Sequence, residues 1–190
     1  MTDLTRSQRK AERERQHQQM LQRYRKQRQR NAAAIPGEMP FAIVLDNLKA
    51  GFNVPKVFRS AQAFAAAEVH LVNIGPFDPA PAKGAFRKVP ARFHEDFAAA
   101  HAELKEKGFE IFALTPHADF NLPTATLPQK SAFILGHEEL GLSFDLEDYP
   151  DIKHIGIPHV GAMESLNVSV AASIVMYEYC RQHNSKFQED

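Results

Sequence analysis

The chain has 190 residues, of which 44% are hydrophobic, and carries 23 basic and 23 acidic residues. This length predicts one domain with a packed core plus an extension. No segment approaches the ~18 consecutive apolar residues of a membrane span, and the first residues lack the apolar core of a signal peptide. The single cysteine, Cys180, cannot form an internal disulfide, so we expect a reducing, cytoplasmic location. Several histidines stand singly and neither CxxC nor HExxH occurs, so no metal site is expected.

The neutral overall charge hides a basic first segment. Residues 1–31 hold 10 Lys or Arg against 3 Asp or Glu, whereas the rest of the chain is acidic overall. Residues 6–30 favour a helix, but Met20, Leu21 and Tyr24 are too few apolar residues to bury one, so alone it should be frayed or disordered. Two interpretations stay open: a solvated extension, or an arm that contacts nucleic-acid phosphates, with Tyr24 available to stack on a base. The candidate contacts in this arm are Arg9, Lys10, Arg13, Arg23, Arg25 and Lys26.

After a linker with Pro and Gly at 32–40, short apolar segments alternate with amphipathic ones. Strands are predicted at residues 41–45, 69–73, 110–114, 132–135 and 152–158. Helices are predicted at residues 53–67, 95–107 and 168–182. An irregular loop at 76–89 carries Lys83, Arg87 and Lys88, which either contact phosphates or are simply solvated. The alternation predicts an α/β fold with a parallel sheet covered by helices on both faces.

Polar residues gather where a predicted strand feeds the last helix. Ser165 and Asn167 flank Leu166 directly ahead of the apolar helical run. Capping the free N–H groups of that helix explains one of these two polar side chains, but not both. Gly136, at the end of another strand, allows a ligand to approach the backbone closely. Strand ends that lead into helices are where α/β proteins usually bind ligands.

Three segments in order carry a resemblance to a known family. They are NVPKVFRSAQAF at 53–64, FILGHEELGLS at 133–143 and GAMESLNVSVAASIVMYE at 161–178. Together they resemble the three motifs of the SpoU (TrmH) family of RNA 2′-O-ribose methyltransferases, in the SPOUT class, over roughly residues 41–182. No GxGxxG follows a strand, which disfavours an NAD site. The resemblance divides the chain into a basic extension at 1–31, the linker at 32–40, a methyltransferase domain at 41–184 and a tail at 185–190.

The resemblance implies a C-terminal trefoil knot, a homodimer, S-adenosylmethionine as cofactor, and tRNA or rRNA as substrate. It implies that Arg59 acts on the ribose hydroxyl by holding a phosphate or stabilising the developing alkoxide, because arginine stays protonated. We expect this arginine to be buried in the same pocket as the other site residues. The implied catalytic residues are Arg59, Asn53, Glu138, Ser165 and Asn167. The implied cofactor-binding residues are Leu114, Thr115, Gly136, Ile157, Leu166 and Ser165.

Three positions depart from the family pattern: Pro55 and Ala65 replace small residues that are often glycine, and His137 replaces the usual Asn or Pro before Glu138. These departures motivate an alternative, a non-catalytic RNA-binding protein that keeps the fold. A SPOUT enzyme that methylates a base nitrogen is a further option, which Ser165, Leu166 and Asn167 disfavour.

Overall fold

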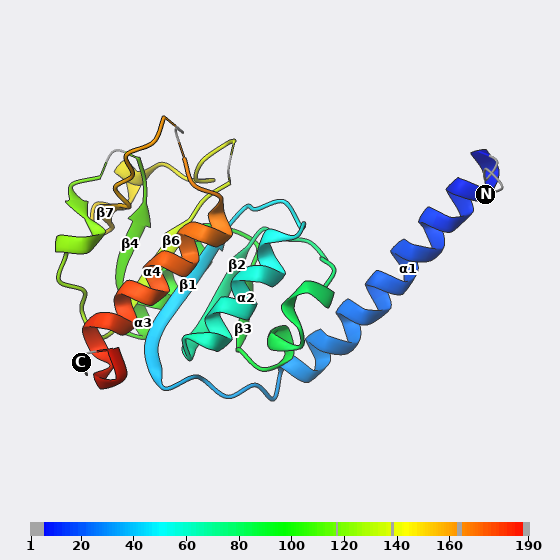
Figure 1. Cartoon of the computed structure of the whole chain (residues 1–190), viewed down its shortest axis with the longest axis horizontal. Coiled ribbons are helices and arrows are strands. Elements are labelled where there is room, and N and C mark those ends of the chain that lie inside the picture. Colours follow the sequence, from blue (N-terminus) through cyan, green and yellow to red (C-terminus); the bar gives the residue numbers. More distant parts are fainter. Residues whose placement is uncertain (1–5, 117, 138, 163–164, 188–190) are drawn as a thin grey trace.

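The computed structural model describes residues 6–116, 118–137, 139–162 and 165–187, and Figure 1 shows how its elements are arranged. Within these residues, seven strands form one sheet, in the order β3-β2-β1-β6-β4-β7-β5, and neighbouring strands are parallel. The strands are β1 Met39–Asp46, β2 Ala66–Val72, β3 Ala91–His94, β4 Glu110–Leu114, β5 Phe120–Asn121, β6 Ser131–Leu135 and β7 Lys153–Gly156. The α-helices are α1 Arg6–Asn31, α2 Asn53–Ala63, α3 Phe97–Glu106 and α4 Val168–His183. This confirms the predicted α/β fold with a parallel sheet.

The central strand β1 pairs with β2 on one side and β6 on the other. Phe41, Ile43 and Leu45 belong to the core shared with α2 and α4, whereas Ala42 and Val44 belong to the core shared with α3. All five side chains are fully buried. A strand covered on both faces needs apolar residues at consecutive positions, which explains the uninterrupted sequence FAIVL.

Several element boundaries differ from the predicted ones. Helix α2 ends at Ala63, four residues early, because Ala65 adopts a left-handed conformation with φ +52° and β2 begins at once. Helix α3 begins at Phe97, where the Asp96 side chain accepts a hydrogen bond from the N–H of Ala99. Strands β3 and β5 were not predicted, because β3 is a four-residue edge strand with polar residues and β5 has two residues.

Helix α1 extends away from the body of the molecule, and only its C-terminal end packs against the rest (Figure 1). Tyr24 is 4% exposed, with its ring centroid 5.2 Å from that of Phe77 and 5.7 Å from that of Phe86. The Asn31 side chain donates to the carbonyl oxygens of Phe86 and Val89, at 2.5 and 2.7 Å, and accepts from a backbone N–H of β3. No helix among the described residues is long and apolar enough to cross a membrane.

These contacts bear on two expectations about the basic segment. Residues 6–31 form the helix that their composition favours, and its last turns have tertiary partners that the helix alone would lack. Tyr24 lies inside an aromatic cluster, so its ring is not available to stack on a base. Its burial instead fixes the direction in which α1 leaves the domain.

We expect Tyr24→Ala to lower the free energy of unfolding by roughly 3 kcal/mol, because it empties a packed aromatic site. The same change should free α1 to be cleaved by trypsin. Chemical denaturation and the rate of tryptic cleavage within residues 6–31 measure both effects. Arg13→Ala, on the exposed part of the same helix, is the control and should change stability by less than about 0.5 kcal/mol. Unchanged cleavage and stability in Tyr24→Ala would show that α1 docks by other contacts.

Candidate functional site

A cavity of about 720 Å³ lies at the carboxyl ends of β4 and β6. Parallel strands of an α/β sheet present their loops at this edge, which is the usual ligand-binding position. Its lining comes from three segments far apart in sequence: the end of β4, the loop after β6, and the residues that lead into α4. The lining residues include Leu114, Thr115, Pro116, Leu135, Gly136, His137, Leu142, Phe144, Ser165, Leu166, Val168 and Ala171. A smaller adjoining cavity, of about 130 Å³, shares several of these residues and adds Ile157.

The loop after β6 is closed tightly around Gly136. A Cβ atom placed on this glycine would lie 2.6 Å from the carbonyl oxygen of Gly141, so no other residue fits without moving the loop. The backbones of His137 and Gly141 exchange two hydrogen bonds, of 2.7 and 2.9 Å. The His137 ring accepts further bonds through Nδ1 from the N–H groups of Glu139 and Leu140. The loop therefore presents a compact backbone wall to the cavity.

Asp46, at the end of β1, anchors the loop after β6 through hydrogen bonds to Ser143. Its carboxylate accepts hydrogen bonds from the backbone N–H of Ser143 at 2.5 Å and from the Ser143 hydroxyl at 2.7 Å. Asp46 is fully buried, and burial raises the pKa of its carboxyl although the two bonds from Ser143 partly offset that rise. This pair was not among the predicted site residues, although the sequence carries a signal for it, an acidic residue that ends an otherwise apolar strand.

The first residues of α2 and α4 meet beside the cavity. Asn167 caps α4: its Oδ1 accepts bonds from the backbone N–H and the hydroxyl of Ser169, at 3.0 and 2.7 Å. Its Nδ2 donates to Oδ1 of Asn53, at the start of α2, over 3.3 Å. Asn167 is thus the capping residue, whereas Ser165 lines the cavity. The predicted partners Asn53 and Asn167 are in contact.

Arg59 lies in a separate groove between α2 and α4. The groove is lined by Lys56, Arg59, Ser60, Pro81, Lys83, Ser169, Val170, Ser173 and Ile174. The hydroxyls of Ser60 and Ser173, two of these lining residues, lie 2.9 Å apart and connect the two helices. Arg59 is exposed, so the expectation of a buried arginine in the shared pocket is wrong for a single chain. The physical reason is that Arg59 is on the solvent side of α2, while Val57 and Phe58 fill the core.

The two hollows use different sides of the first turns of α4. Val168 and Ala171 line the cavity, and Ser169 and Val170 line the Arg59 groove. The polar residues Lys56, Ser60 and Ser173 were not singled out from the sequence. Glu138, an implied catalytic residue, lies outside the described residues.

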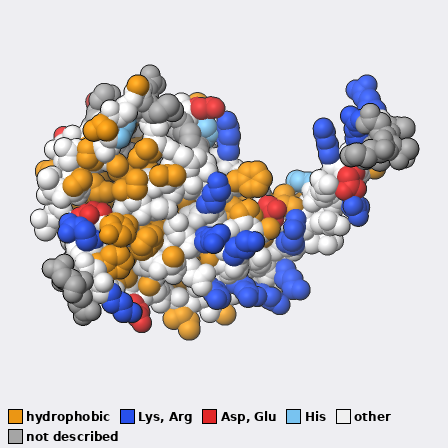
Figure 2. Space-filling model, viewed as in Figure 1, with side chains coloured by type: hydrophobic (Ala, Val, Ile, Leu, Met, Phe, Trp, Pro, Cys, Tyr) orange, Lys and Arg blue, Asp and Glu red, His pale blue; other side chains and the backbone are white. Residues whose placement is uncertain are grey.

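Basic side chains gather around the base of α1 and the neighbouring body, as Figure 2 shows. Lys83, Arg87 and Lys88 are exposed, and Lys83 also lines the Arg59 groove. On α1, the candidate residues Arg9, Lys10, Arg13, Arg23, Arg25 and Lys26 are exposed as well. Arg23 also forms an ion pair within the protein, since its guanidinium lies 3.6 Å from the Asp78 carboxylate.

The departures from the family pattern fit their positions. Pro55 is buried in the first turn of α2, where a missing N–H breaks no helical bond. Ala65 sits at φ +52°, a conformation that glycine adopts without strain and alanine at about 1 kcal/mol or more. His137 forms the ring contacts that close the loop after β6. None of the three disrupts the cavity.

Comparison with known proteins gives consistent matches. The model of the SpoU rRNA methylase family matches residues 40–177. A 23S rRNA (guanosine-2′-O-)-methyltransferase, RlmB, of Nitrosomonas europaea is 34% identical over 78% of this chain and 59% of its own length. A tRNA (guanosine(18)-2′-O)-methyltransferase of Thermus thermophilus is 31% identical over 86% of both chains.

Solved structures show the same fold. The TrmH/SpoU tRNA modifying enzyme of A. aeolicus has a TM-score of 0.70 at 23% identity, covering 85% of this chain and 84% of that one. The SpoU methyltransferase AviRb of Streptomyces viridochromogenes, in complex with the cofactor AdoMet, has a TM-score of 0.68 at 21% identity over 80% and 64%. With the family model covering most of its length, this chain belongs to the SpoU rRNA methylase family.

Proposed function

We propose that this chain transfers a methyl group from S-adenosylmethionine to a ribose 2′-hydroxyl of tRNA or rRNA. The observation that carries the proposal is the convergence of the three motif segments on one end of the sheet. There, a ligand-sized cavity with a backbone-rich wall lies beside a groove that carries an exposed arginine. The names of the relatives, which act on tRNA or rRNA at the 2′-oxygen of guanosine, support the substrate class.

The cavity suits S-adenosylmethionine in size and lining. Its volume of about 720 Å³ lies within the roughly 300–1,000 Å³ typical of small-molecule sites. Leu114, Leu166 and Ile157 offer apolar surface, and the segment around Gly136 offers main-chain groups that a ligand can approach closely. Ser165 and Thr115 add hydroxyls. When bound there, the cofactor would supply an electrophilic methyl group to an incoming hydroxyl.

Arg59 is proposed to hold the RNA at the reacting ribose. Its guanidinium keeps a fixed charge and a planar fork of donors, so it suits a backbone phosphate or a developing alkoxide rather than proton abstraction. Lys56 and Lys83 in the same groove would strengthen the attraction for phosphate. The hydrogen bond between Asn53 and Asn167 joins the first residues of α2 and α4. It would hold the N-termini of these two helices in a fixed relative position.

A homodimer is proposed because one chain separates these two parts. Arg59 and the cavity lie on different sides of α4, whereas methyl transfer needs the donor and the hydroxyl together. The outer face of α4 leaves Val170 47% and Tyr177 51% exposed, with the Phe64 ring centroid 6.4 Å from that of Tyr177. A second copy covering this apolar face would bring its own Arg59 groove toward the cavity of the first.

The finer topology and the location are also part of the proposal. Ser165 and Leu166, which follow β7 and precede α4, line the cavity at the ends of β4 and β6, and α4 packs against α2. This placement, beside the closed loop after β6, supports a trefoil knot at the cavity. Cys180 is a free, buried thiol whose pKa burial raises to about 11, which suits a cytoplasmic protein.

We expect Arg59→Ala to lower the rate of methyl transfer by about 100-fold or more, since it removes charge stabilisation at the reacting ribose. Binding of S-adenosylmethionine should stay within about twofold, because Arg59 does not line the cavity. Transfer of labelled methyl groups to cellular RNA and calorimetry measure the two quantities. Lys105→Ala, an exposed cation of α3 that lines neither the cavity nor the groove, is the control. Full activity in Arg59→Ala would overturn the assigned role.

The basic helix α1 is proposed to contact RNA through its outer half. Replacing Arg9, Lys10 and Arg13 together by alanine should weaken RNA binding and reduce the slope of log affinity against log salt by up to about 2–3, near 0.7–0.9 per lost phosphate contact. This change spares Tyr24 and Asn31, whose contacts a deletion of residues 1–31 would destroy. Filter binding at several salt concentrations measures the slope, with Gln19→Ala as control. An unchanged slope would return α1 to the role of a solvated extension.

Asp46→Asn should weaken S-adenosylmethionine binding by about 10-fold, because an amide leaves one Ser143 donor without its acceptor and loosens the cavity wall. In the native protein the carboxylate must be ionised to accept both bonds. Affinity should therefore fall with decreasing pH, and from a higher pH than for an ordinary aspartate, since burial raises the pKa of Asp46.

Isothermal titration over a series of buffers from neutral to acidic pH measures this dependence, since burial raises the pKa of Asp46. The Asp46→Asn variant should lose it. Ser143→Ala removes one donor, and its effect should not add to that of Asp46→Asn in the double variant. Wild-type affinity in Asp46→Asn at every pH would show that the loop needs no such support.

A further inference from the structure

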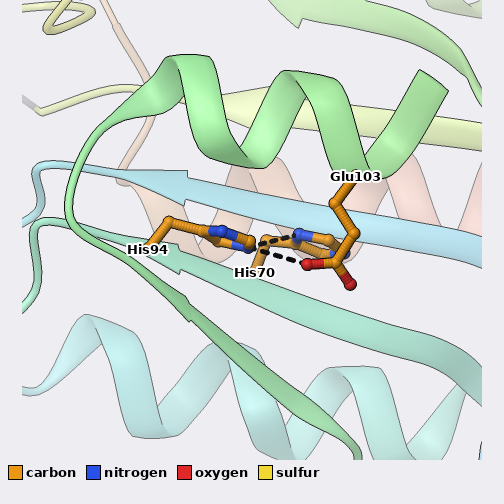
Figure 3. Close-up of side chains that lie close together, drawn as sticks. All are labelled: His70, His94 and Glu103. Carbon is orange, nitrogen blue, oxygen red and sulfur yellow. Dashed lines mark hydrogen bonds and ion pairs between the residues drawn. The ribbon is translucent and has the colours of Figure 1, made fainter. Parts of the chain in front are cut away.

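A cluster of two histidines and a glutamate lies at the β3 edge of the sheet, and none of its residues lines the cavity or the Arg59 groove. His70 comes from β2, His94 from the end of β3 and Glu103 from α3, which packs over this edge (Figure 3). In the register of the sheet His70 is opposite Arg92, so His94, two residues further along β3, points to the same face. Residues that stand singly in the sequence therefore meet in space.

The three side chains present their ligand atoms to one another. Nδ1 of His70 lies 2.9 Å from Nε2 of His94, and that nitrogen lies 3.7 Å from Oε2 of Glu103. All three ligand atoms lie within 4.8 Å of one another. Two imidazole nitrogens and one carboxylate oxygen form a ligand set that zinc commonly uses, with ligand distances near 2.0–2.2 Å. In a tetrahedral site with such metal–ligand distances, neighbouring ligand atoms lie about 3.3 Å apart. The three side chains would therefore need only small shifts to bind a cation.

The hydrogen bonds around His70 leave its Nδ1 ready to act as a ligand. Its Nε2 lies 3.0 Å from Oε1 of Glu68, a carboxylate that can only accept, so Nε2 carries the proton. Nδ1 of the neutral ring then holds a lone pair, and the proton shared with His94 occupies the place that a cation would take. A carboxylate that orients a ligating histidine in this way is a regular feature of metal sites.

Lys107 and Arg92 neutralise the nearby carboxylates without coming between His94 and Oε2 of Glu103. Lys107 donates to both oxygens of Glu68, at 2.7 and 2.8 Å, and to Oε1 of Glu103 at 2.7 Å. Arg92 donates to the second oxygen of Glu68 over 3.1 Å. Oε2 of Glu103 is left facing His94, and the Glu103 side chain is 31% exposed. The Glu103 side chain therefore gives the site its exposure to solvent, while the His70 and His94 side chains are 0% and 7% exposed.

We propose that His70, His94 and Glu103 bind one divalent cation of the zinc class, which fastens α3 to the β2–β3 edge. The Glu68 carboxylate positions His70, and Lys107 moderates the affinity through its positive charge. The expectation from the sequence, that no metal site exists, treated these histidines as scattered. The proposal stands apart from methyl transfer and holds or fails without it.

Cobalt(II) is the probe for the test, because its visible absorption reports tetrahedral nitrogen and oxygen ligands in solution. The full chain, freed of metal by chelation, should bind one Co²⁺ with such a spectrum, and Zn²⁺ should displace it and raise the Tm. His94→Ala should weaken binding by about 100-fold, and Glu103→Gln by about 10-fold or more. Lys107→Met should tighten it several-fold, because a nearby positive charge is removed.

Two matched variants serve as controls. His101→Ala removes a histidine of the same helix α3 that is paired with Asp151 at 3.1 Å, and Glu106→Gln changes an exposed acid of that helix. Both should bind cobalt as the native chain does. Should the native chain show no stoichiometric cobalt spectrum, the cluster is a hydrogen-bond network and the proposal fails. Binding that survives in Glu103→Gln and His94→Ala but is lost in His101→Ala would place the cation elsewhere and overturn it equally.

Discussion

The burial of β1 between β2 and β6 is the constraint on which the rest of the structure depends. Because both of its faces are covered, Phe41 and Ile43 anchor α2 and α4, while Ala42 and Val44 anchor α3. The same strand ends in Asp46, whose carboxylate fixes the loop after β6 through Ser143. A fully buried carboxylate is tolerated only with such partners. The buried core thus positions one wall of the cavity through Asp46, the residue directly after Leu45, the last apolar residue of β1.

The two sides of helix α4 line different parts of the site. Successive residues of a helix point about 100° apart, so the neighbours Val168 and Ser169 face different hollows. One side, with Val168 and Ala171, closes the proposed cofactor cavity, and the other, with Ser169 and Ser173, forms the proposed ribose and phosphate groove with Arg59. This separation is the observation behind the proposed homodimer, because the cavity and the Arg59 groove are lined by different residues of one chain.

The edges of the sheet carry features that the central site does not use. At one edge, β3 with its neighbouring loop receives Asn31 and the base of α1, so the basic helix leaves the domain in a fixed direction. On the same strand, His94 meets His70 and Glu103 on the face covered by α3. A short strand of mixed polarity therefore carries both the attachment of the basic helix and the proposed cation site.

The sequence by itself determined the central strands, the class of the sheet and the three motif segments, because uninterrupted apolar runs and local capping chemistry are set by neighbouring residues. A cap of α4 at Ser165 or Asn167 is one such local property, and the structure assigns it to Asn167. Tertiary structure alone decided the burial of Tyr24, since its partners Phe77 and Phe86 lie more than 50 residues away. It also decided that Arg59 faces solvent and that His70 meets His94. Each of these depends on how separate elements pack together, which no periodicity within one element encodes.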